Sequence, residues 1–428
     1  MTAPSRDHLG RPLVAVTGVG LVTPLGIGVA ESWGGLLAGR SGIRRITRFP
    51  VDHLKTTIAG GVDLPGDDAT GEAAPASVRV ERFAALAIEE ALAGAGAVVD
   101  GRFPGPLFLG MPPVEVAWSL RMDLARRAGG EGAVRYPAMA VAGNGSRQAF
   151  EACLFGGVGE RLAARFGTRG APVSLSTACA TGASAIQMGV EAVQRGEARS
   201  ALCVGAEGTV EAESLIRFSL LSALSTRNED PARASRPFEK TRDGFVMAEG
   251  AAALVLESLD EARARGATVL GLVLGCGERA DSFHRTRSNP DGGAIVGAMR
   301  SAIADAGLAP DRIDYVNAHG TGTPENDKME TLGMRAVFGD APPPISSNKS
   351  MIGHTLSAAG AIEAVFSLLT MRDGRLPPTI NHETPDPAIN LDVVPNEARD
   401  SKVERVLSNS FGFGGQNVCL VLGAAPGG

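Results

Sequence analysis

The chain is predicted to have an α/β fold, because short strand-like runs alternate with helical stretches along almost its whole length. Of its 428 residues, 44% are hydrophobic and 21% are charged, which is the balance of a globular protein with a large core. The strand-like runs are short and apolar, so the sheets should be buried. The length allows two or three domains.

The predicted elements follow in order along the chain. Strands are expected at residues 13–16, 173–176, 202–204, 251–257, 269–274 and 313–316, and helices at residues 81–93, 181–195, 259–265, 294–306 and 358–371. Residues 63–76 and 281–293 are predicted to be surface loops from their polar residues, Gly and Pro. Gly266 ends the helix at 259–265 and a new strand follows, which divides the chain into residues 1–265 and 266–428. The sequence itself shows no convincing internal repeat.

Charge, cysteine usage and hydropathy exclude several classes of protein. The formal net charge of −6 argues against a nucleic-acid binder, which needs a basic surface. The cysteines are odd in number and have no CxxC spacing, so we expect a reducing, cytoplasmic setting. The beginning of the chain lacks the apolar run of a signal peptide, and no stretch of about 20 apolar residues predicts a membrane span. The cysteines are Cys153, Cys179, Cys203, Cys276 and Cys419.

Cys179 is the first candidate for a reacting group. It stands between the strand-like run at 173–176 and the small-residue helix at 181–195. A thiol at a helix N-terminus lies beside unpaired N–H groups and the positive end of the helix dipole, which favour the thiolate nucleophile. Taken alone, however, a single cysteine is more often an inert, buried apolar side chain.

Two histidines stand in comparable settings. His319 lies where a strand runs into the turn Gly-Thr-Gly-Thr, and the hydroxyls of Thr321 and Thr323 are suited to an amide-bearing substrate arm. His354 follows Lys349 by five residues, and a turn at Gly353 would bring the two into one pocket. The ammonium group would then keep the imidazole of His354 neutral. Each histidine alone would more often be structural.

The fourth candidate is the glycine-rich segment at residues 408–417, which reads Ser-Asn-Ser-Phe-Gly-Phe-Gly-Gly-Gln-Asn. Glycines on both sides of Phe413 permit positive φ angles, so this segment is predicted to be a mobile loop with an aromatic gate. The alternative is a glycine turn that packs two phenylalanines into the core. One cysteine and two histidines could also bind zinc, but a fourth ligand is not apparent, and no metal is expected.

Together, these segments resemble the elongating β-ketoacyl synthases of fatty acid and polyketide biosynthesis. The resemblance extends over nearly the whole chain and keeps the order of the family's motifs. A Cys-His-His set is similar to the elongating branch, whereas initiating synthases carry Cys-His-Asn and chain-length factors lack the cysteine. The motifs are Val-Thr-Gly-Val-Gly-Leu-Val-Thr-Pro-Leu-Gly at 16–26, Thr-Ala-Cys-Ala at 177–180, Leu-Ser-Thr-Arg-Asn at 224–228 and Ser-Arg-Pro-Phe-Glu-Lys-Thr-Arg-Asp-Gly-Phe-Val at 235–246.

The resemblance implies a thiolase-like fold in which two similar halves stack as a layered αβαβα core. The first half would supply Cys179 and the second both catalytic histidines. It further implies a homodimer, or a heterodimer with a related synthase subunit, and substrates carried on the phosphopantetheine of an acyl carrier protein, without another cofactor. The implied roles are the oxyanion hole for the backbone N–H groups of Cys179 and Phe413, the gate for Gly412, Phe413 and Gly414, substrate binding for Thr321, Thr323, Phe411 and Met111, ordering of the site for Lys349, and supporting hydrogen bonds for Glu330.

The chain departs from the usual pattern at positions 109–114 and 416. The segment Leu-Gly-Met-Pro-Pro-Val replaces a glycine-rich run near the acyl pocket, and Gln416 stands where Thr is usual. One hypothesis is that Met111 shapes a pocket for a very long or branched acyl chain, and the other is that the change is neutral. Two rival classes are a thiolase, with Cys419 as a second reacting cysteine, and a non-enzymatic partner subunit. The Lys349–His354 motif and the intact Cys-His-His set argue against them.

Overall fold

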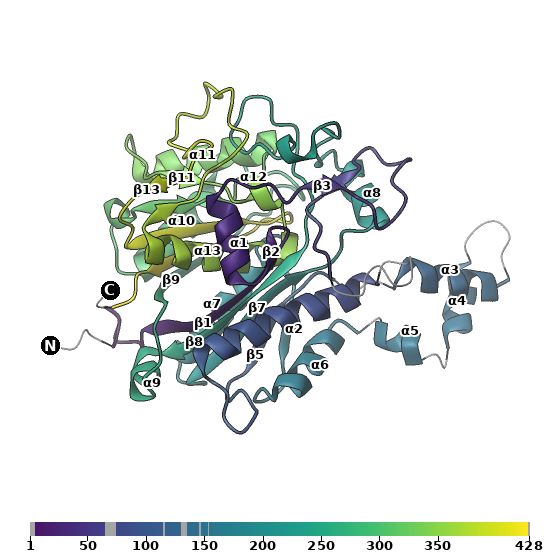
Figure 1. The fold of residues 1–428 in the computed structure, drawn as a ribbon, viewed down its shortest axis with the longest axis horizontal. Coiled ribbons are helices and arrows are strands. Elements are labelled where there is room, and N and C mark those ends of the chain that lie inside the picture. Colours follow the sequence, from purple (N-terminus) through teal and green to yellow (C-terminus); the bar gives the residue numbers. More distant parts are fainter. Residues whose placement is uncertain are drawn as a thin grey trace.

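A computed structural model describes residues 5–64, 74–113, 116–129, 135–144, 147–152 and 154–426. Within these residues, one large mixed sheet of eleven strands forms the centre of the molecule (Figure 1). Its strands run in the order β11-β10-β14-β15-β9-β1-β8-β7-β5-β6, and β2 pairs with β1. Their bounds are β1 Val14–Thr23, β2 Gly26–Ile27, β5 Leu107–Gly110, β6 Val173–Leu175, β7 Ser200–Glu207, β8 Gly250–Ser258, β9 Gly271–Ala280, β10 Tyr315–Asn317, β11 Ile345–Ser346, β14 Arg405–Phe411 and β15 Gln416–Gly423.

The two ends of this sheet repeat one topology. Numbered along the chain within each half, the strands lie in the order 3-2-4-5-1, both for β1, β5, β6, β7 and β8 and for β9, β10, β11, β14 and β15. The second, third and fourth strands of each half are parallel, and the fifth pairs antiparallel with the fourth and the first. The halves meet where β1 pairs antiparallel with β9. The implied two similar halves are therefore confirmed by the strand order.

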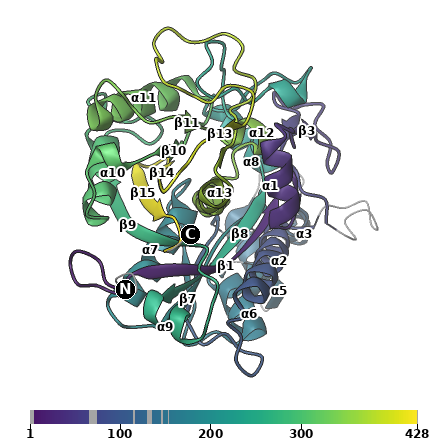
Figure 2. The same ribbon diagram turned by 60° about the vertical axis from the view of Figure 1, so that its left-hand side comes forward.

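Helices cover both faces of each half and complete five layers (Figure 2). The central helices α7 (Thr181–Gln194) and α13 (Ala359–Asp373) contact each other and strands of both halves. Helices α2 (Ala76–Ala95) and α6 (Gly157–Phe166) cover the outer face of the first half. Helix α10 (Gly293–Asp305), with α11 (Pro324–Phe338) packed on it, covers the second. This arrangement confirms the thiolase-like layered fold.

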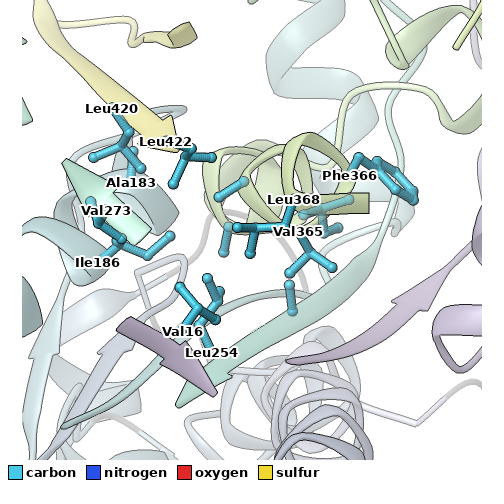
Figure 3. Packing of buried hydrophobic residues seen from close by; sticks show 14 of the residues in the cluster. Val16, Ala183, Ile186, Leu254, Val273, Val365, Phe366, Leu368, Leu420 and Leu422 are labelled. Atoms are coloured by element: carbon cyan, nitrogen blue, oxygen red, sulfur yellow. The ribbon is translucent and has the colours of Figure 1, made fainter. Parts of the chain in front are cut away.

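The central layer is the most deeply buried part of the protein. Every residue from Ala359 to Met371 in α13 is buried, and Figure 3 shows Val365 and Leu368 among apolar side chains from several strands. A Cβ added at Gly182 of α7 would lie 2.6 Å from the backbone nitrogen of Ala361, so small residues are required where the two helices cross. This close packing fixes the start of α7 in the middle of the molecule, next to Cys179.

The predicted helices and strands are all present, with ends shifted by a few residues and with β1 and β9 extended beyond the predicted runs. Residues 281–292 have no regular structure, as expected, while most of the predicted loop at 63–76 lies outside the described residues and α2 begins at Ala76. The remaining elements are α1 Val29–Leu37, β3 Arg44–Arg45, β4 Ile58–Ala59, α8 Ala212–Leu220, η1 Pro231–Arg233, α9 Leu259–Ala264, η2 Pro310–Arg312, α12 Lys349–Ile352, η3 Leu356–Ala358, β12 Arg375–Leu376 and β13 Arg399–Asp400.

Three helices that the sequence did not predict project from the body of the molecule (Figure 1). They are α3 (Trp118–Arg127), α4 (Tyr136–Gly143) and α5 (Arg147–Ala152). Large apolar side chains on them are exposed, namely Trp118, Met122, Tyr136, Val141 and Phe150. Among the described helices, none is long and apolar enough to cross a bilayer.

Candidate active site

Cys179 lies in a tight turn between β6 and α7. Ala178, the residue before it, has a φ of 50°, a left-handed conformation that costs an alanine about 1–2 kcal/mol. Thr181 holds the turn, because its hydroxyl accepts from the backbone N–H of Thr177 at 2.8 Å and donates to the carbonyl of Ala178 at 2.6 Å. The strained turn presents the thiol at the N-terminus of α7, as the sequence predicted.

His319 is positioned by a buried carboxylate on α11. It follows β10, and its backbone N–H donates to Glu330 Oε1 at 2.9 Å while that of Gly320 donates to Oε2 at 2.7 Å. The side-chain amide of Asn409 on β14 also donates to Glu330, at 3.0 Å. Glu330 therefore ties the turn after β10 to a neighbouring strand and a covering helix.

His354 is fixed by backbone hydrogen bonds on both sides. Gly353, with a φ of 75°, ends α12 and turns the chain, after which the N–H of His354 donates to the carbonyl of Val246 at 2.7 Å. Its ring Nδ1 accepts from the N–H of Leu356 at 3.3 Å. Because a backbone N–H can only donate, the proton of the neutral ring is on Nε2. That Nε2 is buried and has no partner among the described residues, so it is a free donor.

The three candidate groups come together in one buried cluster. The sulfur of Cys179 and a ring nitrogen from each of His319 and His354 all lie within 4.8 Å of one another. The two imidazoles meet edge to face with ring centroids 5.3 Å apart, and the ring of Phe411 stands 5.8 Å from that of His319. The structure thus joins a thiol from the first half to two imidazoles from the second.

Both imidazoles are held neutral. Burial lowers the pKa of His319 and of His354 well below the usual histidine value, and the positive charge of Lys349 lowers both further. Lys349 forms an ion pair with Glu363 on α13, where each side chain is only 1% exposed. The predicted turn at Gly353 and the predicted effect of the ammonium on His354 are both confirmed.

The expectation of a readily ionised thiol is wrong for this buried cysteine. Burial raises the pKa of Cys179 to about 11, although the backbone N–H of Phe413 and the charge of Lys349 act in the opposite direction. The carboxylates of Glu207 and Glu363 raise the pKa further. Desolvation of the thiolate therefore outweighs the N-terminus of α7, and the thiol is protonated at neutral pH.

The glycine-rich loop at 412–416 closes over the thiol. Its Phe413 N–H points at the sulfur of Cys179. The loop is hydrogen-bonded to residues 281–289, since Gly414 N–H donates to the carbonyl of Arg285 and Asp281 N–H donates to that of Gly415, both at 2.8 Å. A Cβ added at Gly415 would lie 1.8 Å from the Asp281 carbonyl oxygen, so the loop needs glycine here.

A pocket of about 470 Å³ leads to Cys179 from the surface. Thr321 and Thr323, whose hydroxyls are 2.9 Å apart, line it together with Phe411, Gly412, Phe413 and Gly414. Met111 does not line it, because that side chain packs in a separate hydrophobic cluster around α2 and β5. The sequence had not identified the mouth of the pocket, whose lining includes His284, Arg285, Thr286, Arg287, Ser288 and Lys328.

The structure argues against a metal site and against a second reacting cysteine. The three ligand atoms are close enough to hold a metal ion, but the Lys349 ammonium that disfavours a charged imidazole would disfavour a metal cation as well. Cys419 is buried in the core on β15, where its thiol donates to Asn409 Oδ1 at 3.3 Å, and it does not line the pocket. A second reacting cysteine of the thiolase kind is therefore excluded at Cys419.

The duplicated layered fold, with a buried thiol beside two neutral imidazoles, defines an enzyme of the thiolase-like class. Family models agree: "Beta-ketoacyl synthase, N-terminal domain" matches residues 12–262 and "Beta-ketoacyl synthase, C-terminal domain" matches residues 270–383. The chain belongs to the β-ketoacyl synthase family.

Individual relatives span the chain almost completely. It is 38% identical over 426 residues to a 3-oxoacyl-[acyl-carrier-protein] synthase 2 of Coxiella burnetii and 37% identical over 427 residues to that of a Synechocystis strain, covering 96% of this chain and 98% of the relative in both cases. Among solved structures, a β-ketoacyl synthase from Burkholderia phymatum superposes with a TM-score of 0.84 at 34% identity, covering 96% of this chain and 99% of the other. The ishigamide ketosynthase/chain length factor gives 0.81 at 35%, covering 97% and 100%.

Proposed function

We propose that this protein is a 3-oxoacyl-acyl carrier protein synthase of the elongating type, acting in fatty acid or polyketide biosynthesis. It condenses an acyl group on Cys179 with malonyl-acyl carrier protein, giving 3-oxoacyl-acyl carrier protein, carbon dioxide and free carrier protein. The observation that carries the proposal is the Cys179 sulfur within 4.8 Å of a ring nitrogen of both His319 and His354, in a buried pocket.

In the first half-reaction, Cys179 takes the acyl group. The sulfur attacks the thioester carbonyl of an acyl-carrier protein, and the backbone N–H groups of Cys179 and Phe413 stabilise the oxyanion. The proton of the thiol is transferred to the departing phosphopantetheine sulfur, so charge balances over the step. Because burial raises the pKa of the Cys179 thiol to about 11, the thiol carries this proton at neutral pH.

In the second half-reaction, malonyl-carrier protein enters and loses carbon dioxide. The electron pair of the broken C–C bond forms an enolate, whose oxygen accepts hydrogen bonds from the neutral imidazoles of His319 and His354. The enolate carbon attacks the acyl-Cys179 carbonyl, a C–C bond forms and the Cys179 thiolate leaves. The thiolate then takes up a proton from water, which restores the resting thiol. The proton on Nε2 of His354 supports this role, because it provides the donor that the enolate needs.

Several other residues are proposed to support the reaction. Lys349 keeps both imidazoles neutral, and Glu330 fixes the turn that carries His319. Thr321 and Thr323 bind the amides of the phosphopantetheine arm, which their place in the pocket lining supports. Gly412 and Gly414 form the gate with Phe413, and Phe411 binds substrate. Met111 is kept as a hypothesis for the acyl pocket. We propose that the reaction uses no metal or redox cofactor, since decarboxylation supplies the carbon nucleophile.

An acyl carrier protein is the proposed partner at the pocket mouth. Arg285, Arg287 and Lys328 line the mouth, their side chains are exposed, and none forms an ion pair among the described residues. Such cations suit an acidic partner despite the net charge of −6. One of the similar solved structures, at 30% identity and a TM-score of 0.84 over 97% of this chain and 100% of the other, is a ketosynthase in complex with its type II polyketide carrier protein.

We further propose that the protein is a cytoplasmic homodimer. The projecting helices α3, α4 and α5 expose Trp118, Tyr136, Val141 and Phe150, and a surface of this kind marks a protein interface. A heterodimer with a related synthase subunit is the alternative, which sedimentation of the purified chain alone would reveal as a monomer. The division into residues 1–265 and 266–428 is supported by the repeated strand order and by the two family-model matches, which end at residue 262 and begin at residue 270.

The test is intact-protein mass spectrometry after incubation with acyl-carrier proteins of different chain length. Wild type should gain the mass of an acyl group, Cys179→Ala should not, and adding malonyl-carrier protein should discharge the adduct as 3-oxoacyl product. A folded wild-type protein that no acyl chain modifies would refute the proposal, and a Cys179-independent adduct would place the nucleophile elsewhere.

A further inference from the structure

Glu207 is a buried carboxylate that the proposed mechanism does not use. It is the last residue of β7 and has no exposed surface. Its Oε1 accepts from the backbone N–H groups of Gly208 at 3.1 Å and Thr209 at 3.0 Å, and from the Thr209 hydroxyl at 2.5 Å. Within the described residues, Glu207 forms no ion pair with a Lys or Arg side chain. Neutral donors alone therefore compensate the carboxylate.

The other oxygen of Glu207 reaches the second half of the molecule. Glu207 Oε2 accepts from the backbone N–H of Ser357 at 3.2 Å. Ser357 is the middle residue of η3, whose first residue, Leu356, has a φ of 42°. A leucine in this left-handed conformation is strained and persists only where its surroundings hold it. The bond to Glu207 is one constraint that holds it.

Leu356 connects this constraint to the catalytic imidazole. Its backbone N–H is the donor to Nδ1 of His354, the contact that leaves the proton on Nε2. Two hydrogen bonds, joined by the peptide bond between Leu356 and Ser357, therefore connect Glu207 to the ring of His354. If the backbone at Leu356 relaxed to a negative φ, the N–H would turn away from Nδ1, and the tautomer with the proton on Nδ1 would become available.

We propose that Glu207 is a positioning residue for the decarboxylation half-reaction: its carboxylate fixes the backbone at Leu356 and Ser357, and through it the orientation and proton position of His354. This proposal deepens the function proposed above and rests on it for its kinetic consequence. The structural consequence, a fixed proton on Nε2 of His354, depends only on the hydrogen bonds.

The charge of Glu207 provides an independent readout. The negative charges of Glu207 and Glu363 raise the pKa of the Cys179 thiol, whereas the positive charge of Lys349 lowers it. His319 and His354 are neutral and add no charge of their own. Burial raises the pKa of Glu207 to about 7, against its hydrogen bonds with Thr209 and Ser357. Above that pH the carboxylate disfavours the thiolate of Cys179, so removing its charge should make the thiol more acidic, whereas loosening of the site would have no such directed effect.

Two matched variants separate the effect of the length of the Glu207 side chain from the effect of its charge. Glu207→Asp keeps the charge but retracts it from Ser357, and Glu207→Gln keeps the length but removes the charge and places an NH₂ group against N–H donors. Thr209→Val is the control, since it removes one hydroxyl contact and leaves the bond to Ser357 intact. The measurements are carbon dioxide release from malonyl-carrier protein, acyl transfer to Cys179, iodoacetamide alkylation of Cys179 against pH, and ¹⁵N spectra of histidine-labelled protein.

Both Glu207 variants should lose at least about tenfold in decarboxylation and less than about threefold in acyl transfer, with Thr209→Val near wild type. In Glu207→Gln, alkylation of Cys179 at pH 8.5 should become faster, and in Glu207→Asp it should not. The His354 ¹⁵N signals should show Nε2–H in wild type and a mixture of tautomers in Glu207→Asp. Equal losses in both half-reactions, or an unchanged tautomer in Glu207→Asp, would overturn the proposal. A wild type inactive in both half-reactions would refute the proposed function instead, while the ¹⁵N spectra would still decide the role of Glu207.

Discussion

Removing the buried ammonium of Lys349 should destabilise the protein strongly. In Lys349→Met, the Glu363 carboxylate would lose its cation in a site where it is 1% exposed and where its Oε2 already has no hydrogen-bond partner. Breaking a buried ion pair on one side typically costs about 3–5 kcal/mol. Removing both charges, in Lys349→Met/Glu363→Gln, should cost clearly less, because neither charge of the ion pair is left without its partner.

The cost should also depend on pH. Burial raises the pKa of Glu363 to about 7 even with Lys349 present, and without the cation the pKa will rise further. The folded protein then binds a proton that the unfolded chain has released, so stability falls as pH rises from the unfolded pKa of about 4.5 to the folded value, at about 1.4 kcal/mol per pH unit. Wild type already loses stability up to its own folded pKa of about 7, so the two proteins differ only above that pH. The penalty of Lys349→Met should therefore be about 1.4 kcal/mol larger at pH 8 than at pH 6.

Urea unfolding followed by far-ultraviolet circular dichroism measures both effects, with wild type, the single variant and the double variant at one protein concentration. The same variants report on the site, because loss of the Lys349 charge should raise the pKa of both imidazoles. The reasoning would be refuted if the single variant lost less than about 1 kcal/mol, or if its penalty were the same at pH 6 and pH 8.

Three further predictions concern the thiol, the gate and the mouth. Since burial raises the pKa of Cys179 to about 11, its alkylation by iodoacetamide should accelerate about tenfold per pH unit from pH 7 to 10; a plateau near pH 8 would contradict this. Gly415→Ala should lower kcat/KM by at least about tenfold, because its Cβ would lie 1.8 Å from the Asp281 carbonyl oxygen. Gly170 has a similar positive φ but open space around it, so Gly170→Ala should leave turnover unchanged. Equal effects of the two substitutions would point to backbone strain alone. The double variant Arg285→Glu/Arg287→Glu should raise KM for acyl-carrier protein about tenfold at low salt, with little change in kcat. Arg169→Glu, outside the pocket, is the control. An unchanged KM in the double variant would exclude these side chains from docking.

The sequence singled out the three side chains that the structure brings together, because each stands beside residues that only a turn or helix start explains. Cys179 precedes a small-residue helix, and His319 and His354 stand beside glycines with positive φ. Helix α11 was missed although its start carried a signal: the Thr323 hydroxyl caps the N–H of Asn326, and Pro324 occupies the first turn. The projecting helices were missed because their apolar side chains face outward, so no core-facing stripe marks them.

Other features could not be predicted because they arise only from tertiary packing. The pKa of Cys179 depends on how completely the gate loop and surrounding side chains exclude water, which no local pattern encodes. Glu207 and Glu363 are acids on a strand and a helix that sequence patterns assign to the surface, yet both are buried. The duplication is visible in the order and direction of the strands but not in the residues that form them.

The repeated strand order suggests how such an enzyme could have arisen from a doubled gene. Cys179 follows the third strand of its half, β6, and Lys349 and His354 follow the third strand of the other half, β11. His319 stands two residues after the second strand, β10, and the equivalent place two residues after β5 is occupied by Pro112. In an ancestor with identical halves, both positions would have carried the same side chains. Once the copies diverged, one half could keep the thiol and change its remaining loops, while the other kept the two imidazoles and the lysine beside them.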